Sequence, residues 1–125
     1  MMSKAYEFLK ECGTFFVATV NGDLPAVRPF GAVMEIENEL YFSTGSKKNV
    51  YKQLQENRHV QIVALKQGTR EWIRLNGIAV EVMDLNLKQK MLDICPILTK
   101  RFSSKDDPLF ALFKLEQMQV YLNNE

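Results

Sequence analysis

The hydrophobic and polar positions of this chain alternate over several segments and follow a helical spacing over three others. The alternating segments are rich in β-branched and aromatic residues, as half-buried strands usually are. We expect about six strands, with the last one either continuous or split near Glu116, over residues 14–20, 25–36, 40–43, 60–65, 71–83 and 110–122. The helical spacing predicts helices over residues 5–12, 46–56 and 84–95.

Turn and cap residues separate these segments. Asn21 and Gly22 together form a strong signal for a short hairpin. Ser46 and Asp84 can each cap the helix that follows. Gly77 interrupts an alternating segment, which indicates a β-bulge or a close approach of two backbones. Because no alternation of strand and helix runs through the chain, the pattern predicts a mainly β fold, an antiparallel barrel or sandwich with inserted helices.

Composition and charge narrow the function classes. The chain has 125 residues, of which 46% are apolar and 25% charged, so we expect a single globular domain over residues 1–125. Sixteen basic and fifteen acidic residues give a net charge of +1, which disfavours a nucleic acid or an anionic membrane as partner. No segment approaches the roughly 20 apolar residues of a membrane span, and charges interrupt the first twelve residues, so we expect a cytoplasmic protein. No metal-ligand spacing or nucleophile motif is present.

Lys47 and Lys48 occupy an electrostatically unfavourable place. They fall in the first turn of a predicted helix, where unpaired N–H groups already present about half a positive charge. A bound anion would reverse the sign of this interaction, because the N–H groups, the ammonium groups and the hydroxyls of Thr44 and Ser46 would converge on one phosphate. The alternative is that both lysines are solvated and that Ser46 is only a cap.

Arg28 is the second candidate for anion binding. It lies inside a predicted strand and directly precedes Pro29, which belongs at a sheet edge because it has no N–H to offer. The planar guanidinium fits phosphate oxygens, although an outward-facing arginine on an edge strand would also satisfy the pattern. If the hairpin places this strand beside the one that ends at Thr44, Arg28 and Lys48 face the same cavity.

The order of these motifs resembles the flavin-binding split-barrel family related to pyridoxamine 5′-phosphate oxidase, and within it the short branch similar to nitroimidazole reductases. The motifs are RPFG at 28–31, YFSTGSKKNVY at 41–51 and WIRLNG at 72–77. The resemblance implies a six-stranded antiparallel split barrel that binds flavin mononucleotide (FMN). It also implies a homodimer with the flavin at the subunit interface.

Carried over residue by residue, the resemblance implies a cofactor site. Its residues are Arg28, Pro29, Phe30, Gly31, Ser43, Thr44, Ser46, Lys47, Lys48, Asn49, Val50, Trp72 and Arg74. In this assignment the arginine of the RPFG motif reaches the flavin phosphate, and the next three residues follow the flavin ring. The serine and threonine at 43–44 and the loop at 46–50 surround the phosphate. Trp72 and Arg74 lie on the strand that completes the partner's pocket. Asn49 stands where close relatives are expected to carry an acidic residue.

The resemblance favours a flavin-dependent reductase, which passes electrons from a nicotinamide donor to a small acceptor such as a nitroaromatic or a quinone. Such a protein needs no acid–base pair of its own, because the cofactor carries the chemistry. A flavin carrier or sensor without turnover, and a barrel that holds haem, are alternatives. An oxidase of vitamin B6 metabolism is less expected, because those enzymes bind the substrate phosphate with an arginine and a histidine near the C-terminus. The single histidine here, His59, lies just before a predicted strand.

Overall fold

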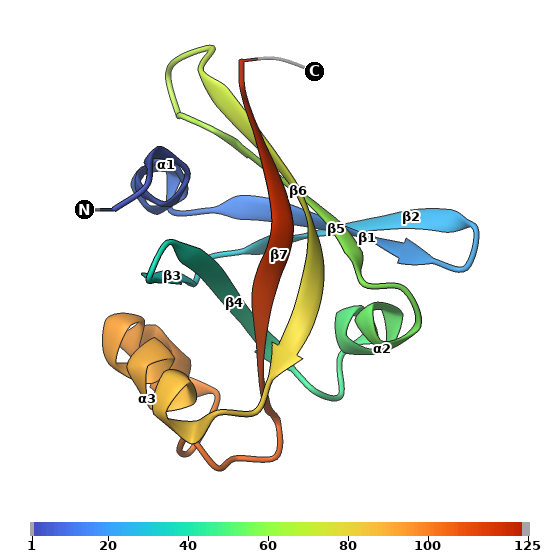
Figure 1. Cartoon of the computed structure of the whole chain (residues 1–125), viewed down its shortest axis with the longest axis vertical. Coiled ribbons are helices and arrows are strands. Elements are labelled where there is room, and N and C mark those ends of the chain that lie inside the picture. Colours follow the sequence, from blue (N-terminus) through green and yellow to red (C-terminus); the bar gives the residue numbers. More distant parts are fainter. Residues whose placement is uncertain (1, 124–125) are drawn as a thin grey trace.

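The described part of the chain has seven strands, which form one antiparallel sheet in the order β2-β1-β5-β6-β7-β4-β3 (Figure 1). The computed structural model describes residues 2–123. Its elements are α1 (Lys4–Cys12), β1 (Phe15–Asn21), β2 (Leu24–Phe30), β3 (Val33–Ile36), β4 (Glu39–Gly45), α2 (Asn49–Glu56), β5 (His59–Leu65), β6 (Trp72–Val82), α3 (Leu85–Ile94), the 3₁₀ helix η1 (Pro96–Lys100) and β7 (Phe110–Leu122).

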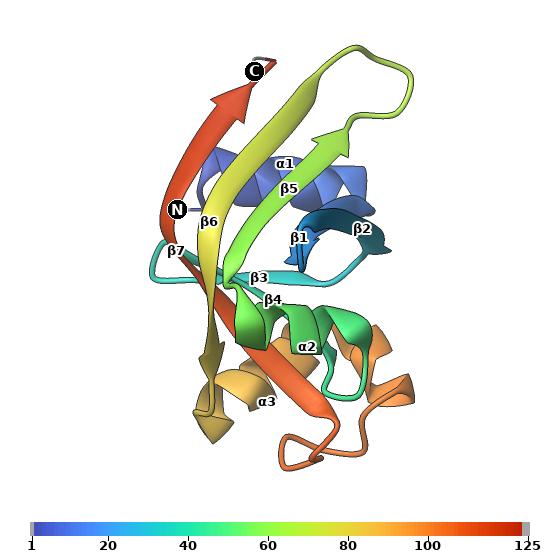
Figure 2. The ribbon, with the colours of Figure 1, turned by 90° about the vertical axis from the view of Figure 1, so that its right-hand side faces the viewer.

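The sheet curls so that its two edges lie near each other without pairing. Strands β2 and β3 lie at opposite edges, yet only Gly31 and Ala32 separate them in the chain. A link of this length spans at most about 11 Å, so the edges must be close together. The ring of Phe30 on β2 contacts the ring of Phe42 on β4, with centroids 5.6 Å apart. The sheet is therefore an open barrel, as Figure 2 shows from the side.

The strand count corrects the expectation of six. Residues 25–36 were expected to form one strand, and they form β2 and β3 instead, because the chain crosses between the sheet edges at Gly31. The expected split near Glu116 is absent, since β7 runs without a break. The irregularity is a bulge, in which Gln117 and Met118 lie opposite Gly77. A Cβ on Gly77 would lie 3.3 Å from the carbonyl oxygen of Glu116, which confirms the predicted close backbone approach.

The predicted caps have different outcomes. Asp84 caps α3, because its Oδ1 accepts hydrogen bonds from the N–H groups of Asn86 and Leu87 at 2.8 and 3.2 Å. The prediction that Ser46 caps α2 is wrong. This helix begins three residues later at Asn49, and its N-cap residue is Lys48, which makes no side-chain cap. Ser46 instead donates two long-range hydrogen bonds, which are described below.

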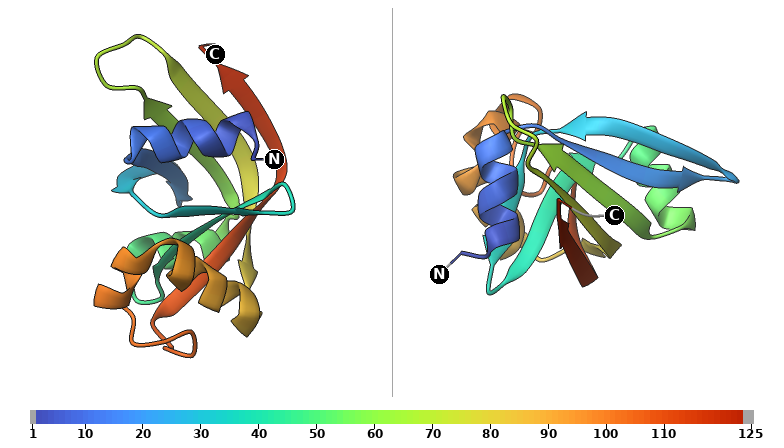
Figure 3. Two further views of the ribbon diagram at one scale, coloured as in Figure 1. Left: turned by 90° about the vertical axis from the view of Figure 1, so that its left-hand side faces the viewer. Right: turned by 90° about the horizontal axis from the view of Figure 1, so that it is seen from above.

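Two apolar clusters fill the fold. The larger one lies between the sheet and helices α1 and α2, and the smaller one joins α3 and η1 to β3, β4 and the start of β7. Helices α1 and α3 lie on either side of β3 (Figure 3). Within residues 2–123, no helix has the length and apolar character needed to cross a membrane.

Candidate flavin site

A cavity of about 550 Å³ lies where the two apolar clusters meet. Its volume is within the range usual for small-molecule sites, about 300–1,000 Å³. Three walls enclose it: the link from β2 to β3, the end of β4 with the start of α2, and η1 with the start of β7. Nine of the expected cofactor residues line it, namely Arg28, Pro29, Phe30, Gly31, Ser43, Thr44, Lys47, Lys48 and Val50.

Arg28 lies on the inward face of the edge strand β2, because it pairs with the fully buried Val17. Its Nη1 donates to Oγ1 of the buried Thr19 at 2.7 Å, and its Nη2 donates to Oε1 of the buried Gln53 at 2.7 Å. Both acceptors are neutral, and burial lowers the pKa of Arg28, although a guanidinium remains charged in proteins. Hydrogen bonds thus fix the two terminal nitrogens of the guanidinium, while its Nε donates to no described residue.

The loop after β4 carries the cavity's lysines. Lys47 and Lys48 are exposed, and neither side chain makes an ion pair or hydrogen bond within residues 2–123. The backbone N–H of Lys48 donates to the carbonyl of Gly45 at 3.0 Å, which shapes the turn. Among the described residues, no acidic side chain lines the cavity. The positive end of α2 and the two lysines therefore face a cavity with no counter-charge from the lining.

The end of β4 adds a buried hydroxyl. Ser43 and Thr44 are 7% and 6% exposed, and both line the cavity. The Oγ of Ser43 is buried and has no hydrogen-bond partner among the described residues. A buried polar atom without a partner is costly, so a ligand that bonds to it would remove this cost. The two residues are therefore well placed for a polar group of the ligand.

Ser46 belongs to the support of the site instead of its lining. Its backbone N–H donates to the carbonyl of Leu109 and its Oγ donates to the carbonyl of Pro108, both at 2.9 Å. These bonds tie the loop after β4 to the segment before β7. Asp107 braces that segment, because its carboxylate accepts hydrogen bonds from the backbone N–H groups of Ser103 and Leu109. These bonds lower the pKa of Asp107, and the bond from Ser103 has the largest effect.

Comparison with known proteins decides the family. The family model for pyridoxamine 5′-phosphate oxidase matches residues 1–124. The chain belongs to this family. Its structure resembles a NimC/NimA family protein of Clostridium acetobutylicum, with 38% identity and a TM-score of 0.91 over 97% of this chain and 86% of that one. The family and the expected split-barrel fold class are therefore confirmed, with seven strands in an open sheet.

Two more distant relatives share the fold. General stress protein 26 of Bacillus anthracis is 19% identical, with a TM-score of 0.79 over 94% of this chain and 88% of that one. A general stress protein of Xanthomonas citri, named as binding FMN or FAD, is 21% identical, with a TM-score of 0.75 over 98% and 88%. The comparison with curated proteins finds no match.

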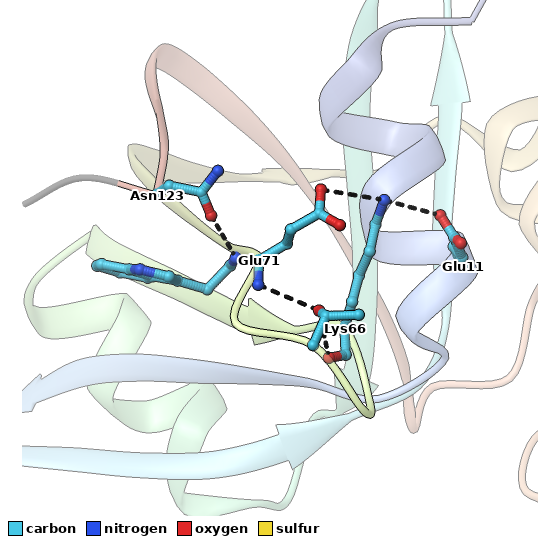
Figure 4. Close-up of polar contacts among 6 residues, drawn as sticks. Glu11, Lys66, Glu71 and Asn123 are labelled. Atoms are coloured by element: carbon cyan, nitrogen blue, oxygen red, sulfur yellow. Dashed lines mark hydrogen bonds and ion pairs between the residues drawn. The ribbon is translucent and has the colours of Figure 1, made fainter.

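Trp72 and Arg74, the two family positions expected to complete a partner's pocket, lie away from the cavity. They project from the outward face of β6, where the guanidinium of Arg74 lies 4.4 Å from the ring centroid of Tyr121. The backbone of Trp72 is fixed by Asn123, whose Oδ1 accepts from the Trp72 N–H at 2.9 Å (Figure 4). In the same view, Lys66 in the turn from β5 to β6 forms an ion pair with Glu11 of α1, with 3.2 Å between Nζ and Oε2. Asn49 is also exposed and does not line the cavity.

The third wall of the cavity was not predicted from the sequence. It consists of Ile97, Leu98, Arg101, Phe102 and Leu109, and Thr14 adds to the lining from the segment before β1. These residues reach the cavity because α3 and η1 fold back onto β3 and β7. The sequence signals the turn only through Pro96, which follows α3. Nothing in the local pattern indicates that the returning segment faces the RPFG motif.

Proposed function

We propose that this cavity binds FMN through its phosphate. The observation that carries the proposal is the gathering of Arg28, Lys47 and Lys48 on one cavity that has no acidic lining residue. A phosphate monoester carries about −1.5 to −2 charges at neutral pH, so it would supply the missing counter-charge. The FMN/FAD-binding relative of Xanthomonas citri supports a flavin as the ligand.

The residues present fit such a ligand. The free edge of Arg28 and the two lysines would hold the phosphate, and the unpartnered Ser43 Oγ would gain a hydrogen bond from or to the ligand. The backbone from Pro29 to Gly31 would lie along the ring system. The ring of Phe30 is held against Phe15 and Phe42 at centroid distances of 6.2 and 5.6 Å, which gives this wall a fixed shape.

We further propose that the protein is an oxidoreductase that takes electrons from a nicotinamide donor and reduces a small acceptor, such as a nitroaromatic or a quinone. When bound, the flavin would supply the electron-transfer chemistry. The chain would bind and orient it and exclude water from one of its sides. The similarity to a NimC/NimA family protein supports this choice. A flavin carrier without turnover remains the second candidate, because a site that only binds flavin would need the same cavity and the same cations.

We also propose a homodimer with the flavin sites at the subunit interface. The outward face of the sheet carries apolar side chains that one chain leaves in solvent: Phe16 is 46% exposed, Val27 66% and Leu65 57%. Trp72 lies opposite Leu65 in the β5–β6 register, so it extends the same face. Such an apolar face is typical of a contact with another subunit. Within residues 2–123, no histidine, cysteine, methionine or tyrosine lines the cavity, so the lining offers no side chain that could ligate a haem iron.

A fluorescence titration with FMN and with riboflavin tests the phosphate site. Charge-assisted hydrogen bonds contribute about 1.5–3 kcal/mol each, so riboflavin should bind at least about tenfold more weakly than FMN. Lys48→Gln should reduce this difference. Lys52→Gln should not, because Lys52 is exposed on the same helix and does not line the cavity.

Equal affinities for FMN and riboflavin would refute the phosphate site. With FMN bound, loss of the oxidised flavin absorbance on addition of NADH or NADPH without oxygen would support the oxidoreductase. An unchanged spectrum with both donors would favour the carrier.

A further inference from the structure

The positive charge at the cavity exceeds what one phosphate can balance. Four of the chain's sixteen basic residues line the cavity, namely Arg28, Lys47, Lys48 and Arg101, and no acidic residue between positions 2 and 123 does. A phosphate monoester brings at most about two negative charges. With FMN bound, about two positive charges would remain without a counter-charge, which favours a second anionic group in the same cavity.

Arg101 is the cation that stands apart from the proposed phosphate loop. It directly follows η1, and its backbone N–H donates to the carbonyl of Leu98 at 2.9 Å. Its side chain is exposed and makes no ion pair or hydrogen bond with residues 2–123. Since only the backbone of Arg101 takes part in the fold, its guanidinium is available to a ligand.

The surface beside Arg101 is apolar. Ile97 is 60% exposed and Leu109 is 38% exposed, and both line the cavity. Between them in sequence, Phe102 is buried and stacks on Phe110 with ring centroids 4.8 Å apart, so this wall is well packed from behind. A cation next to exposed aliphatic side chains fits a ligand that has a flat apolar body and one anionic end.

We propose that Arg101, Ile97 and Leu109 form a subsite for an anionic second substrate of the class of aromatic carboxylates. Arg101 binds the carboxylate, and the two aliphatic side chains cover the aromatic body. The inference rests on the proposed flavin function, because the flavin phosphate accounts for the cations of the other walls. It adds a preference for acceptors with a negative charge.

The test compares 4-nitrobenzoate with 4-nitrobenzamide, which have nearly the same shape and differ in charge. Calorimetry on the oxidised, FMN-loaded protein measures the binding of each probe at a fixed ionic strength of about 0.1 M, where exposed charges act over roughly 10 Å. We expect the acid to bind about tenfold more tightly than the amide, as one charge-assisted contact allows. Arg101→Gln should abolish this preference, and Arg101→Lys should retain part of it.

Lys100→Gln is the matched control, because Lys100 is the neighbouring exposed cation and does not line the cavity. It should leave the preference for the acid unchanged. Equal binding of acid and amide by the unaltered protein, or an equal effect of the two variants, would overturn the subsite. So would Arg101→Gln if it weakened FMN instead of the acid, since Arg101 would then serve the flavin phosphate. A protein that takes up no FMN refutes the proposed function instead, whichever way the heats of the acid and amide compare.

Discussion

A substitution at Gln53 can change the charge of the proposed phosphate site without altering a residue that lines the cavity. Its Oε1 accepts hydrogen bonds from Thr19 Oγ1 at 2.5 Å and from Arg28 Nη2 at 2.7 Å, and the residue is only 9% exposed. Gln53→Glu has the same shape and keeps both acceptor bonds. It also places a carboxylate against the guanidinium, which would cancel most of the positive charge that Arg28 offers to a ligand.

The expected effect is on ligand selectivity and not on folding. A charged hydrogen bond to phosphate contributes about 1.5–3 kcal/mol, so Gln53→Glu should weaken FMN binding by about tenfold or more. Riboflavin has no phosphate, and its affinity should stay the same. Because the carboxylate gains an ion pair with Arg28, we expect urea denaturation to show equal or slightly higher stability.

Gln53→Leu is the companion variant. It removes the acceptor of two hydrogen bonds and leaves the partners at a buried position, so it should destabilise the fold by about 1–3 kcal/mol. Fluorescence titration with FMN and riboflavin, together with urea denaturation, separates the two effects. If Gln53→Glu folds and binds FMN as tightly as the unaltered protein, Arg28 does not take part in phosphate binding.

Three further predictions concern the cations of the cavity, the proposed dimer interface and Asp107. Arg28→Ala and Lys48→Ala should each weaken FMN binding. In a double-mutant cycle their effects should differ from additivity by more than about 0.3–0.5 kcal/mol. Only Arg28→Ala should also lower stability, because it alone removes hydrogen bonds to buried oxygens. If the proposed dimer forms, light scattering should show that Trp72→Glu is a monomer, and flavin titration should show weaker binding. A monomeric unaltered protein with flavin bound would contradict the proposed interface. Backbone hydrogen bonds lower the pKa of Asp107, so its stabilisation is present above the unfolded-state pKa of about 3.9 and is lost as the pH falls through the folded-state pKa. The difference in Tm between the unaltered protein and Asp107→Asn should therefore shrink below about pH 4, and a difference that does not depend on pH would argue against this role.

The sequence predicted those features that local chemistry decides. The period-two alternation located the strands, and the Asp84 cap is a bond within two or three residues of its acceptor. Gly77 signalled a bulge, and a Cβ at this position would make a tight contact of 3.3 Å with the Glu116 carbonyl oxygen. Each of these features depends on nearby residues of the chain or on the type of one residue, so the local sequence is enough to predict it.

The features that the sequence could not predict depend on contacts between segments that lie far apart in the chain. Pro29 signals that this segment lies at a sheet edge, but nothing in the local pattern shows that the chain then crosses to the opposite edge at Gly31. Ser46 has the chemistry of a cap, but its Oγ and N–H instead donate to the carbonyls of Pro108 and Leu109, about sixty residues later. Arg101 was missed for the same reason, since it meets the other cations only when η1 folds back onto the barrel.

The cations of the cavity differ in how they can act on an anion. Arg28 is partly buried and fixed by Thr19 and Gln53, so the cost of ordering its side chain is already met when a ligand arrives. Lys47 and Lys48 are exposed and have no such support within residues 2–123. Salt screens exposed charges over about 8 Å at physiological ionic strength and screens partly buried ones much less. Arg28 would therefore set where a phosphate binds, while the lysines would mainly add a salt-sensitive attraction.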